Sequence, residues 1–370
     1  MALEKSLTFL LFILVGFLIR KNFANKDQVN GIKNIILTIA LPATIFVALM
    51  RVEVELSMLL YPALALAINL LLYAIMPVIL RLFGVQKDSK EARTLKLLLP
   101  SLAPGLSCFP FILEFLGEEE LAFAALADVG NKVFVLIILY VIAMNMYLRL
   151  KGKGTDAEGE SKLKSLVVAL FKEPINLVMI AAIALLCLGF NLDTLPGFVS
   201  DAAVRFGAMM TPLILLFIGL AVKVKKEKLG SLIGLLLSRA GITLLLSAGI
   251  IYAFNITAPS VMLLAVVFPL SSCSFWPFAH MSAFNAREKE AKSFDLDLAL
   301  LVLALSLPLS TMLILGILAD GEAFTHLPVI AITGLLLVIS GLVPALVKRM
   351  KWKLRMPEAP LGKEVAKSLK

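Results

Sequence analysis

The sequence predicts an all-helical protein that crosses a membrane many times, and its composition carries this prediction. Hydrophobic residues fill 60% of the 370 positions, against roughly 45–50% in soluble domains. Charged residues fill 16%, where about 25% is usual, and the mean hydropathy is +0.96. A soluble globule has too little interior to bury so much apolar surface. The composition therefore excludes a soluble enzyme, a disordered scaffold and a secreted disulfide protein.

Eleven apolar stretches are the candidate membrane-spanning helices. A helix needs about 20 predominantly apolar residues to cross the hydrocarbon core. The stretches lack internal turn clusters, so helices are favoured over barrel strands. They cover residues 3–19, 35–50, 57–83, 95–116, 121–148, 174–190, 204–222, 230–253, 260–284, 296–318 and 327–347.

The charges between the stretches predict the orientation of the chain. Segments after odd-numbered spans are basic, as from Lys87 to Lys96, whereas those after even-numbered spans are acidic, balanced or uncharged, as at Glu118. Cytoplasmic loops carry an excess of Lys and Arg. We therefore expect an integral protein of a bacterial or archaeal cytoplasmic membrane, with its N-terminus outside and its C-terminus inside. The net charge of +9 then reflects topology and anionic lipids as partners, not nucleic acid.

The chain divides into two units of five spans each. Its longest hydrophilic segment, 151–173, has glycines among alternating charges and is typical of a flexible cytoplasmic linker. This linker separates a first five-helix repeat at 1–150 from a second at 174–320, and 321–370 adds an extra helix and a basic tail. Because five is odd, the second unit starts on the opposite side of the membrane, which is the mark of an inverted repeat.

Matched prolines support this repeat. Pro42 and Pro110 lie in the second and fourth spans, 68 positions apart, and Pro212 and Pro277 lie in the seventh and ninth, 65 apart. The fourth and ninth spans also concentrate further prolines and serines. Proline breaks or kinks a helix, and two interrupted helices at matching places are the best sequence pointer to a transport site. Ordinary kinks are the alternative interpretation.

Four segments resemble the auxin efflux carrier family. They are Ile36–Phe46 with its Leu-Pro pair, the stretch from Gly117 to Asp128, the stretch from Pro212 to Gly219, and Ser238 followed by Arg239. The similarity spans about residues 1–318, and the order and spacing of the segments carry it. Phe275, Trp276 and His280 stand where the family commonly has tyrosine and asparagine.

The resemblance implies a fold and a substrate class. The family's ten helices form a five-plus-five inverted repeat, a fold shared with bile-acid symporters. Its helices 1, 2, 6 and 7 form a scaffold, and helices 3–5 and 8–10 form a transport domain with crossed, broken helices 4 and 9. The implied substrate is a small organic anion, and we also consider a homodimer through the scaffold helices. The eleventh helix is additional to this pattern.

The two breaks supply the candidate substrate-binding residues. Half-helix N-termini carry positive dipoles and free amides that suit an anion, and serine hydroxyls add further donors. The alternative is that each serine bonds a carbonyl of its own helix, and that His280 is a neutral packing residue. The candidates are Ser107, Cys108, Pro110, Ser272, Ser274, Pro277 and His280.

Four polar residues are candidates for coupling transport to an ion gradient: Asp128, Asn131, Lys132 and Glu114. Asp128 and Lys132 share a helix face at i, i+4 and can neutralise each other. Ionisable residues inside a membrane span indicate function by default, although a structural pair near the outer interface is the alternative. Glu114 is expected at the outer interface, and Arg239 near the cytoplasmic one.

We therefore expect a secondary transporter that moves a small organic anion by alternating access at the crossing of the fourth and ninth spans. No P-loop, HExxH or GxSxG motif is present, so neither an enzyme nor a cofactor is expected. The three cysteines have no metal-ligand spacing, so no metal is expected. Two alternatives are a transporter-like receptor or sterol and lipid sensor, and a sodium-coupled symporter of the bile-acid type.

Overall fold

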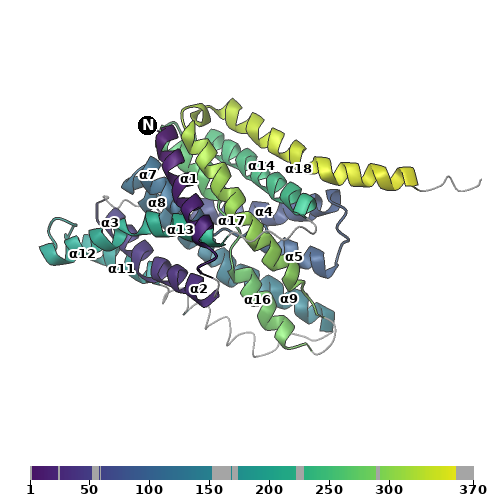
Figure 1. Ribbon diagram of the computed structural model, residues 1–370, viewed down its shortest axis with the longest axis horizontal. Helices are drawn as coiled ribbons and strands as arrows, with labels where there is room; N and C mark the ends of the chain where they lie inside the picture. The colour runs from purple at the N-terminus through teal and green to yellow at the C-terminus, as the bar shows by residue number, and fades with distance from the viewer. Residues whose placement is uncertain are drawn as a thin grey trace, which may run out of the picture.

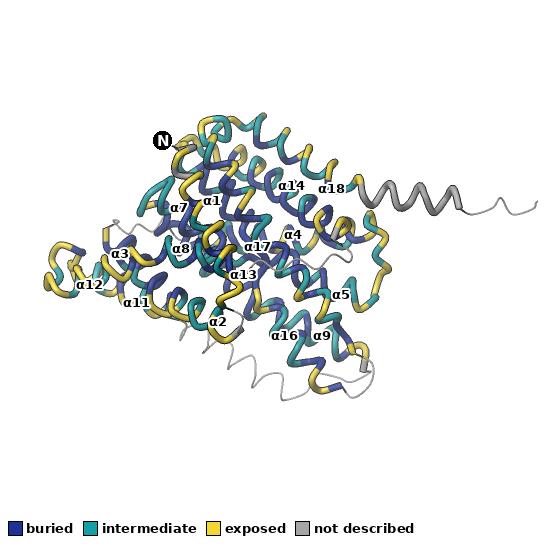
Figure 2. Tube along the Cα trace, viewed as in Figure 1, coloured by how far each residue is buried: buried dark blue, intermediate teal, exposed yellow. Residues whose placement is uncertain are grey.

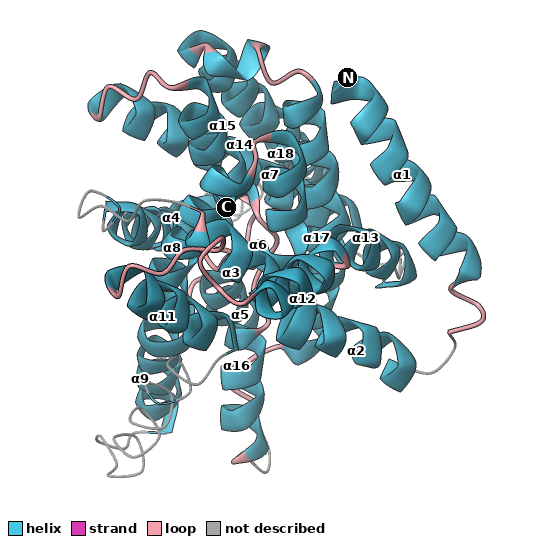
Figure 3. Cartoon of the chain, turned by 90° about the vertical axis from the view of Figure 1, so that its left-hand side faces the viewer, coloured by secondary structure: helices cyan, strands magenta, loops and turns pink. Residues whose placement is uncertain are grey.

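Helices account for all regular secondary structure in the part of the chain that the computed structural model describes (Figures 1 and 3). Most of the predicted linker and the end of the basic tail lie outside this part. The described residues are 2–23, 26–51, 58, 60–151, 168, 174–221, 229–288 and 292–355.

The first half of the chain forms five consecutive helical spans, of which the second, fourth and fifth are built from several segments. The segments are α1 (Ala2–Ile19), α2 (Lys26–Ile35), the π-helix η1 (Ile36–Ala40), α3 (Leu41–Met50), α4 (Leu60–Leu82), α5 (Lys90–Leu98), α6 (Pro104–Ser107), α7 (Phe109–Phe115), α8 (Glu118–Lys132), the π-helix η3 (Val133–Ile138) and α9 (Leu139–Lys151).

The second half forms six more spans, of which the seventh and ninth are segmented. The segments are α11 (Pro174–Cys187), α12 (Gly197–Ala208), α13 (Met210–Ala221), α14 (Leu229–Ala253), α15 (Pro259–Val267), the 3-10 helix η4 (Phe268–Leu270), α16 (Trp276–Ala286), α17 (Leu296–Ala319), the 3-10 helix η5 (Ala323–Thr325) and α18 (Leu327–Arg355).

Six helices of the described chain are long and apolar enough to cross a membrane. They match the predicted spans 2, 3, 5, 7, 8 and 10, and shorter apolar helices match spans 1, 6, 9 and 11. The fourth span appears as the broken series α5, α6 and α7. The prediction of an all-helical membrane protein is therefore confirmed, while the pairing of ten spans by inversion stays a prediction.

The helices fall into two groups by the scaffold and transport division that the resemblance implies, although α3 of the first group also packs against α8 of the second. In the scaffold group (2–50 and 174–221), α1 packs against α13, and α3 packs against α11 and α12. In the crossover group (60–151 and 229–319), α4 packs against α8, α9 against α16, and α17 against α5. Figure 1 shows α3, α11 and α12 at one end of the molecule and α5, α9 and α16 at the other. Residues that are buried run through the centre between them (Figure 2).

The crossing of α1 and α13 depends on two glycines. A methyl group added at Gly16 would lie 2.3 Å from the carbonyl oxygen of Leu216, and one at Gly219 would lie 2.1 Å from that of Ile13. Both distances are far below a van der Waals contact. Only glycine therefore allows the first and seventh spans to approach this closely, as small residues do in membrane helix pairs.

The fourth and ninth spans are both interrupted, and the fourth has one interruption more than the sequence predicts. The helix stops after Leu98 and resumes at Pro104. A second interruption at Cys108, with φ −135° and ψ −47°, separates α6 from α7 and lies in the stretch from Ser107 to Pro110 that the sequence indicates. Proline drives its preceding residue out of the helical region, and Ala103 accordingly has φ −133° and ψ 71°. Pro110 lies in the first turn of α7, where its missing N–H is harmless.

The ninth span breaks where the sequence indicates. The 3-10 helix η4 ends at Leu270, the chain is non-helical from Ser271, and α16 begins at Trp276 with Pro277 in its first turn.

Loops that the charge pattern assigns to one face contact each other. Arg51 and Glu118, from two loops predicted to lie outside, form an ion pair at 2.5 Å. Arg93 Nε, near a loop predicted to lie in the cytoplasm, donates to the carbonyl oxygen of Ser293 at 2.9 Å. These contacts agree with the predicted alternation of the loops, and the assignment of one face to the cytoplasm stays a prediction.

Candidate functional site

The two interrupted spans meet at their breaks and satisfy each other's backbone groups. The amide of Ala103 donates to the carbonyl oxygen of Ser272 at 2.8 Å. In return, the amide of Ser272 donates to Ser107 Oγ at 2.9 Å, and the amide of Ser274 donates to Ser101 Oγ at 3.0 Å. Unpaired backbone is tolerated at membrane depth only where protein or a water-filled cavity supplies partners. Here each break supplies partners for the other.

The serine hydroxyls also bond their own helices, as the alternative interpretation expected. Ser107 Oγ donates to the carbonyl oxygen of Ala103 at 2.9 Å, and Ser101 Oγ donates to that of Leu98 at 2.5 Å. Ser107 and Ser101 thus act as donor and acceptor at once. The Ser272 and Ser274 amides, which we expected to be open to an anion, are engaged with these hydroxyls in this conformation.

Arg239 lies at the centre of this crossing, although the sequence placed it near the cytoplasmic interface. Its side chain is 2% exposed. Its Nε donates to the carbonyl oxygen of Leu99 at 2.6 Å, and its Nη2 donates to those of Ser101 at 3.2 Å and Ser271 at 3.0 Å. These carbonyls end the first half of each broken span, where helix dipoles concentrate negative charge. The guanidinium therefore holds both half-helix ends together by balancing carbonyls, and its depth in the membrane stays a prediction.

One part of this guanidinium is not used by these bonds. A guanidinium has five N–H donors, and the hydrogen bonds of Arg239 to described residues engage only Nε and Nη2. Its Nη1 is free of such bonds within the described chain. The crossing thus contains a fixed positive charge with donors left for an anionic group.

Asp128, Asn131 and Lys132 form a buried cluster on α8 beside the break. Lys132 Nζ lies 3.3 Å from Asp128 Oδ2, and all three residues are at most 5% exposed. Asn131 Nδ2 donates to Asp128 Oδ1 at 2.8 Å and to the carbonyl oxygen of Leu102, within the break, at 3.0 Å. The coupling candidates are therefore connected directly to the crossing, except for Glu114, which lies partly exposed in α7.

Two asparagines connect this cluster to neighbouring helices. Asn69 Nδ2 on α4 donates to Asn131 Oδ1 at 3.0 Å, and Lys132 Nζ donates to Asn176 Oδ1 on α11 at 3.2 Å. The second bond joins the crossover group to the scaffold group. Both asparagines thus join helices through side-chain hydrogen bonds, as polar residues do between membrane helices.

The remaining candidates lie at different depths of the same region. Cys108 is buried, with Sγ 3.5 Å from the carbonyl oxygen of Val267, so it links the two broken spans. His280 lies in α16, where Nε2 is 2.9 Å from the carbonyl oxygen of Val135 and the ring contacts Tyr140 edge-on at 5.4 Å. His280 therefore packs α16 against η3, outside the contacts that join the breaks.

Sequence reasoning missed Ser101 and the central place of Arg239. A signal for Arg239 was present: Asn69 and Arg239 are 170 positions apart, as are Pro42 and Pro212. The repeat that the sequence predicts would give them equivalent places in the third and eighth spans; Arg239 bonds the crossing directly, and Asn69 bonds Asn131 beside it.

These helices and this buried polar crossing define an integral, transporter-like membrane protein. Comparison with known proteins agrees: 235 residues are 27% identical to an uncharacterized transporter of Methanocaldococcus jannaschii, covering 62% of this chain and 71% of the relative. No family model matches the chain.

Proposed function

We propose that this protein is a secondary transporter that moves a small organic anion by alternating access at the crossing of the fourth and ninth spans. The buried guanidinium of Arg239, with Nη1 free of bonds to described residues, is the observation that carries the proposal. A charge at membrane depth is costly, and it marks a substrate or ion pathway more often than a packing site. A fixed cation favours an anionic ligand.

The helix contacts support the inverted repeat behind this mechanism. An inverted repeat makes the first span equivalent to the sixth and the second equivalent to the seventh. The contact of the first span with the seventh (α1–α13) should then have a counterpart between the sixth and the second (α11–α3), and both contacts are present. In the same way, the fifth span is equivalent to the tenth and the fourth to the ninth. The contacts of the fifth span (α8 and α9) with the ninth should match those of the tenth span (α17) with the fourth, and both sets are present. Such pairs place a substrate site between two repeats that rock against each other.

A small cavity beside the break supports a closed state of the transporter. It has about 60 Å³, is lined by apolar residues such as Phe268 and Ala127, and touches Pro269. Ligand sites occupy roughly 300–1,000 Å³. This cavity is not lined by Arg239 or the serines of the breaks. The proposed opening of the crossing would release the Ser272 and Ser274 amides from Ser107 and Ser101.

The Asp128–Lys132 pair is the proposed coupling element. Protonation of Asp128 would weaken its pairing with Lys132, and Lys132 in turn bonds Asn176 in the scaffold group. The charge state of one carboxylate would thus affect the contact between the two groups. The ammonium already supplies the cation beside Asp128, which favours proton coupling over bound sodium.

Uptake into proteoliposomes tests the proposal, with a panel of organic acids under imposed pH, sodium and voltage gradients. We expect Arg239→Gln to lower uptake at least tenfold, because a lost charge-assisted contact of about 1.4 kcal/mol corresponds to tenfold. Arg205→Gln, at an exposed arginine of α12, is the matched control and should transport normally.

The outcomes separate the alternatives. If the folded protein binds an organic acid saturably but does not transport it, the transporter proposal is contradicted and a receptor is favoured. Flux that follows the sodium gradient alone would favour a sodium-coupled symporter. Normal flux in folded Arg239→Gln protein would remove Arg239 from the site.

A further inference from the structure

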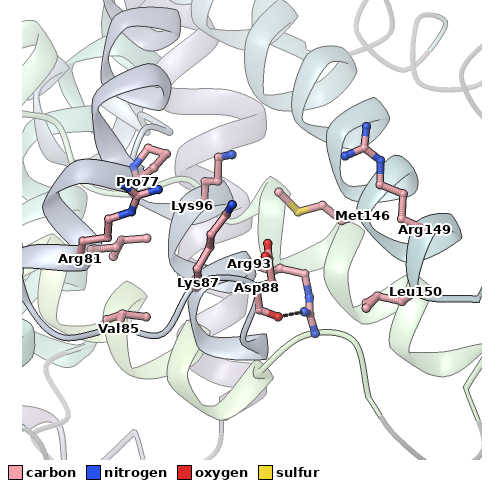
Figure 4. A pocket seen from close by; sticks show the side chains of 12 residues that line it. Pro77, Arg81, Val85, Lys87, Asp88, Arg93, Lys96, Met146, Arg149 and Leu150 are labelled. Atoms are coloured by element: carbon pink, nitrogen blue, oxygen red, sulfur yellow. Dashed lines mark hydrogen bonds between the residues drawn. The ribbon is translucent and has the colours of Figure 1, made fainter.

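A strongly basic cavity of about 390 Å³ lies away from the crossing (Figure 4). It is enclosed by the end of α4, the loop that follows, the start of α5 and the end of α9. Its lining has one acidic residue, Asp88, and five basic residues: Arg81, Lys87, Arg93, Lys96 and Arg149. These three helix termini and the loop lie on the face that the loop charges assign to the cytoplasm.

Two of the cations are held in place by uncharged groups. Arg93 bonds the carbonyl oxygen of Asp88, and its Nε and Nη2 donate to that of Ser293 at 2.9 and 2.7 Å. Lys96 Nζ lies 4.8 Å from the centre of the Tyr73 ring. Asp88 and Glu288 lie close enough to offset part of the charge of Arg93, whereas Lys96 faces an uncharged ring. An anion that binds here therefore meets partly ordered side chains, which lowers the entropic cost of binding.

The positive charges of this cavity exceed the negative ones. Asp88 is the one acidic residue among the described residues that line it. Like charges brought together repel, so a bound anion with more than one negative charge would relieve the repulsion. Arginine forks match the oxygens of a phosphate group in particular.

The rest of the lining is apolar and includes Pro77, Leu80, Val85, Met146 and Leu150. Cations beside apolar side chains at the ends of membrane helices suit an amphiphile, and basic pockets between spans on the cytoplasmic side bind anionic headgroups. We infer that this cavity binds a phosphate-bearing anion, with an anionic phospholipid as the source that the apolar wall favours. The inference is independent of the proposed transport activity.

Binding to the purified full-length protein in neutral detergent tests the inference. The probes are dihexanoyl phosphatidic acid, dihexanoyl phosphatidylcholine and inorganic phosphate, and the readout is the dissociation constant from ligand-dependent thermal stability. We expect saturable binding of phosphatidic acid, weakened about tenfold by Lys87→Gln or Arg149→Gln, as loss of one charge-assisted contact of about 1.4 kcal/mol predicts. Lys21→Gln removes an exposed lysine outside the cavity and should bind normally.

Each result decides one question. Inorganic phosphate could bind as tightly as phosphatidic acid and lose the same affinity in Lys87→Gln. This result would support the phosphate site and assign it to a soluble ligand. Unchanged binding in Lys87→Gln and Arg149→Gln, an equal loss in Lys21→Gln, or equal binding of phosphatidylcholine would overturn the inference. Both cavity residues are exposed, so we expect these variants to fold.

Discussion

At the scale of single residues, the buried charges distinguish this protein from an ordinary helical bundle. Arg239 bonds carbonyls from both broken spans, while Asp128 and Lys132 neutralise each other beside Leu102. A buried ion pair is costly to break, because removal of one partner leaves an uncompensated charge. The two sites therefore differ: backbone carbonyls stabilise the charge of Arg239, and a carboxylate stabilises that of Lys132.

Charge removal should separate pairing from simple packing at Asp128 and Lys132. Asp128→Asn or Lys132→Gln alone should lower the free energy of unfolding by about 3–5 kcal/mol, since each leaves a buried charge unpaired. The double variant should recover much of this loss. Thermal denaturation in detergent measures the effect, and losses in the double variant that simply add would contradict a direct pair.

The site was only partly predictable at this scale. The i, i+4 spacing was sufficient to predict the Asp128–Lys132 pair. The position of Arg239 was signalled only by its spacing of 170 positions from Asn69, and a lone arginine in an apolar helix can also reach an interface by extending its side chain. Only the folded chain shows that the carbonyls of Leu99 and Ser271 lie within its reach.

At the scale of elements, the breaks are maintained by side chains from the opposite span more than by their prolines. Ser101 and Ser107 accept the amides of Ser274 and Ser272. Pro110, by contrast, occupies the first turn of α7, where any residue can begin a helix. Sequence alone identified both interrupted spans through their proline content. It did not indicate the additional interruption between Leu98 and Pro104, because a proline is compatible with either a helix start or a break.

Serine and proline variants should therefore behave differently. Ser101→Ala should cost about 1–3 kcal/mol of stability, because the buried Ser274 amide loses its acceptor. Ser200→Ala, on the partly exposed α12, is the control and should cost little. Chemical or thermal denaturation distinguishes these values, and an equal cost in both variants would argue against the cross-span bond.

Pro110→Ala should retain most transport, if transport is found, because alanine fits the first turn of α7. Uptake at a fixed gradient measures this, with Ser101→Ala measured alongside. Loss of uptake in Pro110→Ala protein of normal stability would return the functional break to the position that the sequence first suggested.

At the scale of the whole molecule, the eleventh helix belongs with the crossover group. α18 packs along α14, and a methyl group added at Gly241 of α14 would lie 2.4 Å from the carbonyl oxygen of Gly334. The sequence predicted this helix as an appendage and gave no indication of its partner, because its apolar faces look alike. Its tight packing against the eighth span implies that it moves with that span.

Two glycines of α14 should respond to alanine with opposite sign. Gly241→Ala should lower stability by about 1–3 kcal/mol through overpacking against α18. Gly249→Ala should raise stability by up to about 1 kcal/mol, because nothing lies within 4 Å of the added methyl group and alanine favours the helix. Unfolding midpoints compare the two variants, and a gain at both positions would show that α18 is not held this closely.

The hydrogen bonds between the two breaks have a consequence for the synthesis and membrane insertion of the protein. Ala103 leaves the ribosome well before its partner Ser272 has been made, and at roughly 5–20 residues per second the gap of 169 positions takes roughly 10–30 s. During this interval the first break has backbone groups whose partners do not yet exist. We therefore expect the fourth span to settle at its final depth only after the ninth has entered the membrane, so that insertion of this chain does not follow the order of its spans.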